Sequence, residues 1–226
     1  MNHFHINKLC LSVAIAGVMT SGLAQAAIDE IVVTANKREQ SLQDIPLTVS
    51  VTSGETIQQS SIVDLIDLQS AVPSLRVNQL QSSAQTNFTI RGFGNGSNNP
   101  GVEPSVAVFV DGVYRSKIQG QISDLPMLER IEVLRGPQST LFGKNASAGV
   151  VNIVTKKPSF ESFGKATFEI GDYNSKVARI YYTGPMNDSV AYSFSANVNT
   201  RDGQSDNPTT GNKLNDRDRF GYRAEL

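Results

Sequence analysis

The chain has 226 residues, of which 39% are hydrophobic and 7% aromatic, and its formal net charge is −1. Because there is no basic excess, we expect no nucleic-acid partner. Because no run of 18 apolar residues occurs, we expect no transmembrane helix.

The N-terminus has the pattern of a cleaved secretory signal peptide. Lys8 supplies a positive charge, Leu9 to Val18 is an apolar run too short to span a membrane, and Ala24-Gln25-Ala26 is an A-x-A cleavage site. We therefore expect residues 1–26 to be removed and the mature chain to begin at Ala27. An uncleaved anchor helix is the alternative.

This cleavage would restrict the chemistry of the mature chain. The only cysteine, Cys10, and the only histidines, His3 and His5, lie in the segment to be removed. The mature chain would have no thiol, no imidazole and no Cys or His metal ligand. We therefore predict that the protein is not an enzyme, and we expect no cofactor, metal site or disulfide.

A β-branched run opens the expected mature chain. Ile31, Val32 and Val33 lie between the acidic Asp29-Glu30 and the basic Lys37-Arg38 and have strong strand propensity. A strand near a chain end offers unpaired backbone groups to a partner strand. The alternative is an ordinary first strand of the following domain.

Residues 37–160 read as one mixed α/β domain. Alternation over Leu47 to Val51 predicts a strand with one covered face. Ser61 and Asp64 fit a capping box, and apolar residues at helical spacing follow, so we expect a helix that ends by Pro73.

Two short strand signals follow in the same domain. Phe88 to Arg91 predicts a strand that closes on Arg91-Gly92-Phe93. Val106 to Val110 and Val113-Tyr114 flank Asp111-Gly112, a dipeptide that favours a primed turn, and this predicts a hairpin.

Leu128 to Pro158 is the most informative stretch of the chain. An apolar strand ends at Arg135-Gly136-Pro137, and a helix-like turn covers Ser139 to Gly143. A small-residue corner from Asn145 to Gly149 then leads into a second strand, Val150 to Thr155.

Beyond Pro158 the hydrophobic period becomes two. Four segments alternate apolar and polar residues: Lys165 to Gly171, Val177 to Tyr182, Val190 to Arg201 and Arg219 to Leu226. Transmembrane barrels show this alternation, and so do soluble sheets with one covered face. The short connection Gly184 to Ser189 and the long one Asp202 to Asp216 favour the barrel.

In this order the segments resemble TonB-dependent outer-membrane receptors, with Leu128 to Pro158 as the most specific match. The resemblance covers essentially the whole expected mature chain. It implies an α+β plug domain, residues 37–160, followed by a transmembrane antiparallel β-barrel of about 22 strands when complete. Residues 161–226 would supply about four strands and stop inside the fourth. The chain would then be a fragment of a longer receptor or a truncated product.

The resemblance assigns a role to residues 27–36, as the TonB box and its linker. The box, which pairs with the periplasmic domain of TonB, would comprise Glu30, Ile31, Val32, Val33, Thr34 and Ala35. Only three residues separate it from the predicted cleavage site, which leaves no room for the extra N-terminal signalling domain of some relatives.

Two arginines fall where the family places plug arginines that pair with glutamates of the inner barrel wall. They are Arg91, in the sequence IRGF, and Arg135, in the sequence LRGP. Their expected partners would lie beyond Leu226. The alternative is that both are exposed arginines at strand ends.

A loop that runs from Gly94 to Pro104 would help to form the substrate floor of such a receptor. Its hydrogen-bonding side chains are Asn95, Ser97, Asn98, Asn99 and Glu103. The segment Gln79 to Gln85 is a second candidate. A solvated linker without contacts is the alternative.

The implied function is energised uptake of a scarce nutrient across the outer membrane. The partners would be outer-membrane lipid, TonB with its inner-membrane energising complex, and a small-molecule substrate, most often a ferric siderophore. Vitamin B12, haem and carbohydrate remain open as substrates. A truncated periplasmic plug that only binds TonB is another alternative. A passive porin-like channel is disfavoured, because porins have neither this plug nor a TonB box.

Overall fold

The computed structural model describes residues 32–34, 38, 40–60, 62, 65–79, 86–95, 101–116 and 127–226. The predicted signal peptide and its cleavage site lie outside these residues. Within the described part of the chain, no helix is long and apolar enough to cross a membrane.

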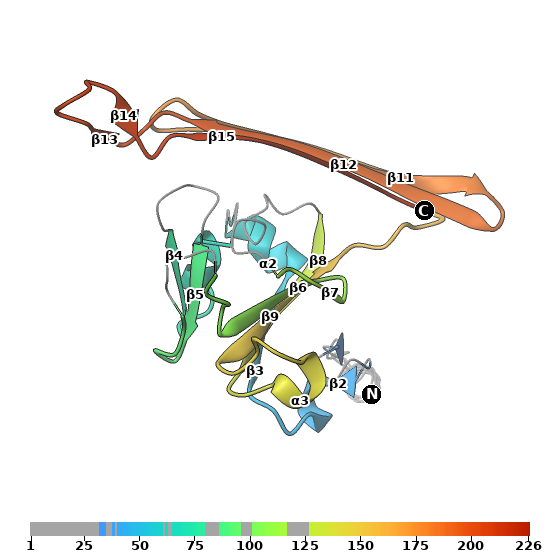
Figure 1. The fold of residues 1–226 in the computed structure, drawn as a ribbon. Coiled ribbons are helices and arrows are strands. Elements are labelled where there is room, and N and C mark those ends of the chain that lie inside the picture. The colour runs from blue at the N-terminus through green and yellow to red at the C-terminus, as the bar shows by residue number, and fades with distance from the viewer. Residues whose placement is uncertain are drawn as a thin grey trace, which may run out of the picture. The chain divides into compact units, whose positions relative to one another are not determined.

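A five-stranded sheet forms the centre of the first region, in the order β3-β8-β9-β6-β7 (Figure 1). Its strands are β3 (Val49–Ser53), β6 (Val106–Val110), β7 (Val113–Tyr114), β8 (Leu128–Arg135) and β9 (Gly149–Thr155). The pair β6–β9 is parallel, and the other three pairs are antiparallel. Strand β3 begins two residues later than the predicted strand at Leu47.

Both faces of this sheet are covered at its centre. On β6, Val106 and Val108 belong to one apolar cluster, whereas Ala107 and Phe109 belong to a second cluster. A strand buried on both faces reads as a continuous apolar run, which explains the sequence VAVFV. The expectation of one covered face concerned residues 47–51 alone, and there the three alternating apolar residues, Leu47, Val49 and Val51, all pack against the second cluster.

The helices are short. Within the described residues they are η1 (Leu42–Asp44), α2 (Gly54–Gln59), η2 (Asp67–Ser70) and α3 (Ser139–Phe142), with η1 and η2 of the 3-10 type. Helix α2 was not predicted; Ser53 caps it, since its hydroxyl accepts a bond from Thr56 N at 3.2 Å. Of the helix predicted between Ser61 and Pro73, the described part contains only the 3-10 helix η2, and Leu65 and Ile66 form a turn before it.

A hairpin joins β4 (Leu75–Gln79) to β5 (Thr86–Ile90). Strand β4 was not predicted, and its Leu75 and Val77 pair with Ile90 and Phe88 in the first cluster. Strand β5 ends one residue earlier than predicted, because the next residue has a φ of 53° and begins a turn.

The β6–β7 hairpin confirms the predicted primed turn. Asp111 and Gly112 have φ values of 48° and 78°, and a primed turn of this kind requires positive φ at both central residues. Two very short strand pairs are also present. In the first region β1 (Val32–Val33) pairs with β2 (Gln40–Ser41), and in a long connection nearer the C-terminus β13 (Ser205–Asp206) pairs with β14 (Lys213–Leu214).

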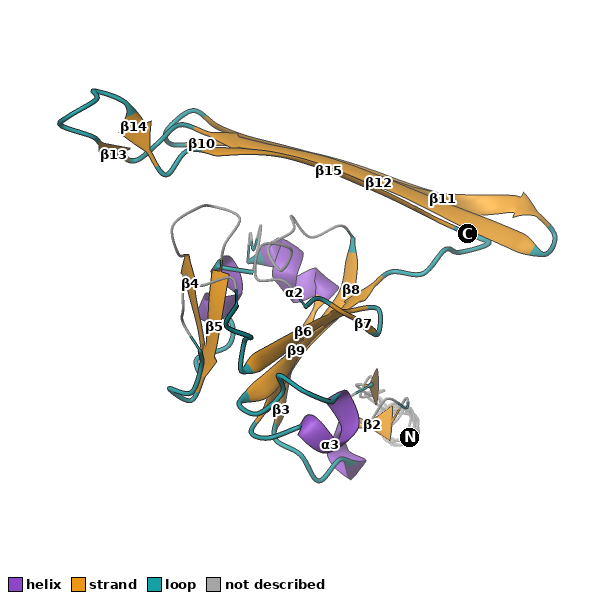
Figure 2. Cartoon of the chain, in the orientation of Figure 1, coloured by secondary structure: helices purple, strands orange, loops and turns teal. Residues whose placement is uncertain are grey.

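A four-stranded antiparallel sheet follows, in the order β10-β11-β12-β15 (Figure 2). Its strands are β10 (Phe163–Gly171), β11 (Ser175–Asn187), β12 (Val190–Arg201) and β15 (Arg217–Glu225). All four predicted strands are confirmed. Strand β11 continues to Asn187, so the turn before β12 is shorter than the predicted connection Gly184 to Ser189.

The two faces of this sheet differ as the alternation predicts. Phe168, Ala178, Val198 and Phe220 lie side by side across the four strands, and the aromatic members are exposed. The opposite face carries buried polar side chains: Thr183, Ser193, Ser195, Asn197 and Asn199.

Candidate functional site

The first described strand is held by a buried side chain. Val33 of β1 is fully buried in the second apolar cluster, which also contains Phe109, Leu134 and Ala146. Among the described residues, the strand pairs with β2 through two residue pairs, Val32 with Ser41 and Val33 with Gln40. Side-chain burial therefore contributes more to its position than the short ladder does.

The next residue bonds to a buried carboxylate. Thr34 N donates to Glu132 Oε1 at 2.8 Å, and its hydroxyl lies 3.1 Å from the same oxygen. Asn152 Nδ2 donates to Thr34 Oγ1 at 3.0 Å and to Glu132 Oε2 at 3.1 Å. Arg130 Nε donates to Glu132 Oε1 at 2.7 Å.

Sequence reasoning missed Glu132 and Asn152. Both are polar residues inside otherwise apolar strands, in the sequences IEV and VNI. A polar residue at such a place must find buried partners, so the pattern itself was a usable signal.

The structure describes only part of the predicted TonB box. Glu30, Ile31 and Ala35 lie outside the described residues. Val32, Val33 and Thr34 are described, and the side chains of Val33 and Thr34 contact the plug.

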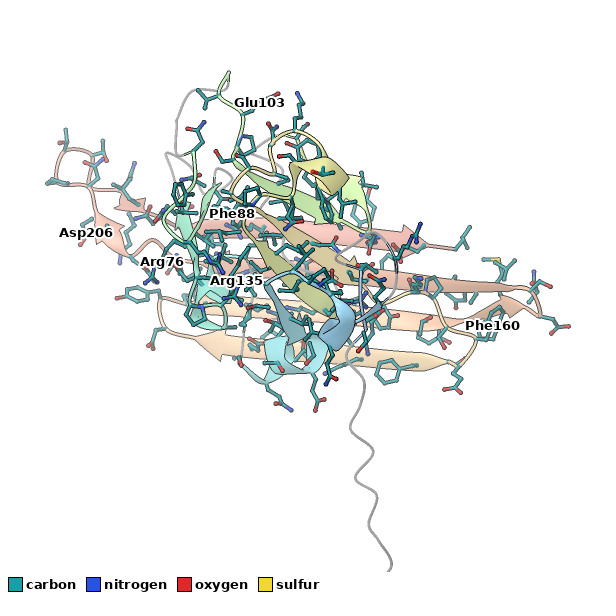
Figure 3. All side chains as sticks on the ribbon, turned by 90° about the horizontal axis from the view of Figure 1, so that it is seen from below. Arg76, Phe88, Glu103, Arg135, Phe160 and Asp206 are labelled. Carbon is teal, nitrogen blue, oxygen red and sulfur yellow. The ribbon has the colours of Figure 1, made fainter. Side chains whose placement is uncertain are left out.

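The two arginines have different surroundings. Arg135, labelled in Figure 3, donates through Nη2 to Ser50 Oγ, while its buried Nε has no partner among the described residues. Arg91 is exposed, with a φ of 53°, and its backbone N donates to Ser74 O at 3.0 Å. Within the described part of the chain, neither guanidinium forms an ion pair.

The predicted substrate loop is described at its two ends. Asn95 Nδ2 donates to Glu103 O at 3.1 Å, and Lys144 Nζ lies 2.5 Å from Glu103 Oε1. Glu103, labelled in Figure 3, is exposed, and the hydrogen bond from Lys144 lowers the pKa of its carboxyl. The same bond raises the pKa of Lys144. Ser97, Asn98 and Asn99 lie outside the described residues.

A second carboxylate that sequence reasoning missed lies at the β6–β7 turn. Asp111 accepts from Thr155 N at 2.8 Å and from Thr155 Oγ1 at 2.9 Å. Arg223 of β15 donates to the same carboxylate at 2.5 Å. These contacts connect the turn to β9 and to the last strand.

The hydrogen bonds of these two carboxylates are suited to holding neighbouring segments together rather than to covalent chemistry. The carboxylates of Glu132 and Asp111 are satisfied by amide, hydroxyl and guanidinium donors. In the described residues, no three His, Cys, Asp or Glu side chains gather as a metal-binding group.

Comparison with known proteins identifies the first region. A model of the family described as TonB-dependent Receptor Plug Domain matches residues 41–150. The chain is 30% identical, over 89% of its length, to the iron-regulated outer membrane virulence protein of Vibrio cholerae, of which it covers 33%. It is 32% identical, over 66% of its length, to the vitamin B12 transporter BtuB of Vibrio vulnificus, of which it covers 25%.

A comparison with solved structures agrees with these sequence matches. The ferric yersiniabactin uptake receptor FyuA from Yersinia pestis matches 75% of this chain with 26% identity and a TM-score of 0.66, and 26% of that receptor is covered. The chain thus spans a third or less of the length of these relatives. The sequence resemblance is confirmed: the chain carries the plug domain of TonB-dependent outer-membrane receptors, followed by strands of the β-barrel.

Proposed function

We propose that the protein takes up a scarce nutrient across the outer membrane with energy delivered by TonB, and that the nutrient is a ferric siderophore. One structural observation carries this proposal: a two-residue strand, β1, lies on the plug just where the sequence resembles a TonB box. The names of two relatives, an iron-regulated outer membrane protein and a ferric yersiniabactin receptor, support the substrate class. The vitamin B12 transporter among the relatives keeps that nutrient as the second candidate.

The proposed layout follows the sequence. Residues 1–26 are a signal peptide, 27–36 the TonB box and linker, 37–160 the plug, and 161–226 the first barrel strands. The exposed apolar face of β10, β11, β12 and β15 then contacts outer-membrane lipid, which explains why its aromatic residues are not covered by protein.

The mechanism that we propose is strand addition. Residues 30–35 leave the plug when substrate binds and pair through their backbone with the periplasmic domain of TonB. The existing ladder is short enough to be exchanged, because it contains two residue pairs. The inner-membrane energising complex then delivers force through TonB to rearrange the plug.

We also propose that Arg91 and Arg135 pair with glutamates of the barrel wall beyond residue 226. The buried Arg135 Nε without a partner supports this, because a buried guanidinium donor left unpaired is costly. Arg91→Ala and Arg135→Ala should each increase hydrogen exchange across the plug of the complete receptor. Unchanged exchange in both variants would remove this part of the proposal.

The loop from 94 to 104 is the proposed substrate floor. Its proposed contacts are Asn95, Ser97, Asn98, Asn99 and Glu103, whose amides, hydroxyl and carboxylate suit a polar chelate. Because Glu103 is held by Lys144, a substrate would bind to an already ordered end of the loop.

Uptake of radioactive iron as a ferric siderophore, in cells that express the complete gene, tests the function. Val32→Pro removes a backbone donor of the proposed box, so it should abolish uptake while substrate binding to cells persists. Val32→Thr is the matched control, because strand addition tolerates many side chains, and it should retain uptake. Equal uptake by the proline variant would contradict TonB pairing at this strand.

The alternative of a truncated plug that only binds TonB has a different signature. An antibody to the plug should detect a protein several times larger than this chain in the outer-membrane fraction. A periplasmic band at about the mass of this chain would favour the truncated plug.

A further inference from the structure

We propose that the carboxylate of Glu132 is the holding site for strand β1, and that it keeps residues 32–34 on the plug until uptake begins. This inference rests on the proposed function for the identity of the strand as a TonB box. The contact of Thr34 with Glu132 is a property of the plug alone.

The first argument is the burial of the carboxylate. The Glu132 side chain is fully buried in the middle of β8, where its neighbours Ile131 and Val133 are core residues. A carboxylate at such a place is unfavourable unless hydrogen-bond donors satisfy both of its oxygens. Its presence in the core therefore needs an explanation beyond packing.

The second argument is the origin of those donors. Arg130 and Asn152 belong to the plug sheet itself, and they donate to Oε1 and Oε2 respectively. The remaining donors come from Thr34, whose N–H lies 2.8 Å from Oε1 and whose hydroxyl lies 3.1 and 3.2 Å from the two oxygens. Departure of the strand would leave the carboxylate short of donors.

The third argument is the position of Thr34 directly after the buried Val33. Val33 occupies the second apolar cluster while Thr34 reaches the carboxylate, so two successive residues fix both the depth and the register of β1. Hydrogen bonds to an ionised acceptor are stronger than neutral ones. Glu132 is therefore a positioning residue for the box, and Asn152 orients both partners.

A quantitative consequence concerns the affinity for TonB. If the box binds TonB only when it has left the plug, the apparent dissociation constant equals the intrinsic one divided by the released fraction. Weakening the Glu132 contact should increase this fraction and strengthen TonB binding in the absence of substrate.

Hydrogen exchange of the complete receptor without substrate tests the proposal at residues 32–34. In Glu132→Gln, exchange at Thr34 should become about tenfold faster or more, because a charge-assisted bond is replaced by a neutral one. Glu129→Gln is the matched control. Glu129 also pairs with Arg130 from β8, but it is about half exposed and makes no bond to Thr34, so its variant should exchange like the parent.

A second pair of variants leaves the plug core unchanged. Thr34→Val removes the hydroxyl at nearly constant volume and should also accelerate exchange at residues 32–34, whereas Thr34→Ser should restore protection. These variants decide the question if Glu132→Gln unfolds the plug. Parental protection of residues 32–34 in Thr34→Val and in a folded Glu132→Gln would overturn the proposal.

Titration with the isolated periplasmic domain of TonB separates this inference from the proposed function. Faster exchange together with tighter TonB binding supports both. Faster exchange with no change in TonB binding supports the holding site and contradicts TonB pairing at residues 30–35. Unchanged exchange with TonB still bound by the parent contradicts the holding site and leaves the proposed function standing.

Discussion

The five-stranded plug sheet and the four-stranded sheet that follows it bury opposite kinds of side chain. At the centre of the plug sheet both faces are apolar and both are covered. In the second sheet the buried polar side chains lie on one face of β11 and β12, and Phe168, Ile170, Phe220 and Tyr222 of the apolar face are at least two-thirds exposed. Protein covers the first sheet, whereas the second needs an apolar medium to cover it.

The largest expected effect is a loss of stability of the plug sheet. Val108→Asp places an unpaired carboxylate beside Val151 of β9 in the first cluster and should cost about 4 kcal/mol or more. Thermal unfolding and protease resistance of the plug would report it. The control is Val113→Asp, because Val113 lies in the same sheet but is 60% exposed, and it should change stability by at most about 0.5 kcal/mol.

A smaller effect would distinguish the two faces of the second sheet. Phe168→Arg places a charge on the face proposed to contact lipid and should destabilise the inserted protein by about 2 to 4 kcal/mol near the bilayer midplane. Heat-modifiability in gels of the outer-membrane fraction would measure this. Thr167→Arg, one residue earlier on the polar face, is the matched control. Equal tolerance of both variants would contradict contact of this face with lipid.

The smallest effect concerns an exposed charge pair at the edge of the plug. The bond from Lys144 lowers the pKa of Glu103, so this contact contributes at ordinary pH and is lost as the pH falls through that lowered value. The raised pKa of Lys144 keeps the contact until strongly alkaline pH. In Lys144→Gln, an NMR titration of Glu103 should give a higher pKa than in the parent. An unchanged titration would show that the pair does not form in solution.

Sequence patterns predicted the second sheet better than the plug. Period-two alternation is a local signal, and it located all four strands, with β12 correct at both ends. The plug elements depend on distant contacts: Leu75 and Val77 become a strand only because Phe88 and Ile90 lie beside them. Short helices such as α2 give too few turns for their periodicity to be detected.

The candidate site was predictable in part. The segment around Val32 and Val33 could be identified because strand propensity is local. The carboxylate that holds Thr34 could not, because Glu132 lies 98 residues further along the chain. Polar residues inside apolar strands signal that partners exist, but they do not say which residues those partners are.

The order of strands in the plug sheet has a consequence for folding kinetics. Among the strands that the structure describes, β3 pairs with β8 alone, and β8 is flanked by β9 on its other side. Residues 49–53 therefore have no ladder until residues 128–135 have been synthesised. Such a high contact order slows folding, since a long loop must close before any pairing stabilises it. The first half of the plug should consequently remain open during synthesis, in a form that a translocation channel or a chaperone could still accept.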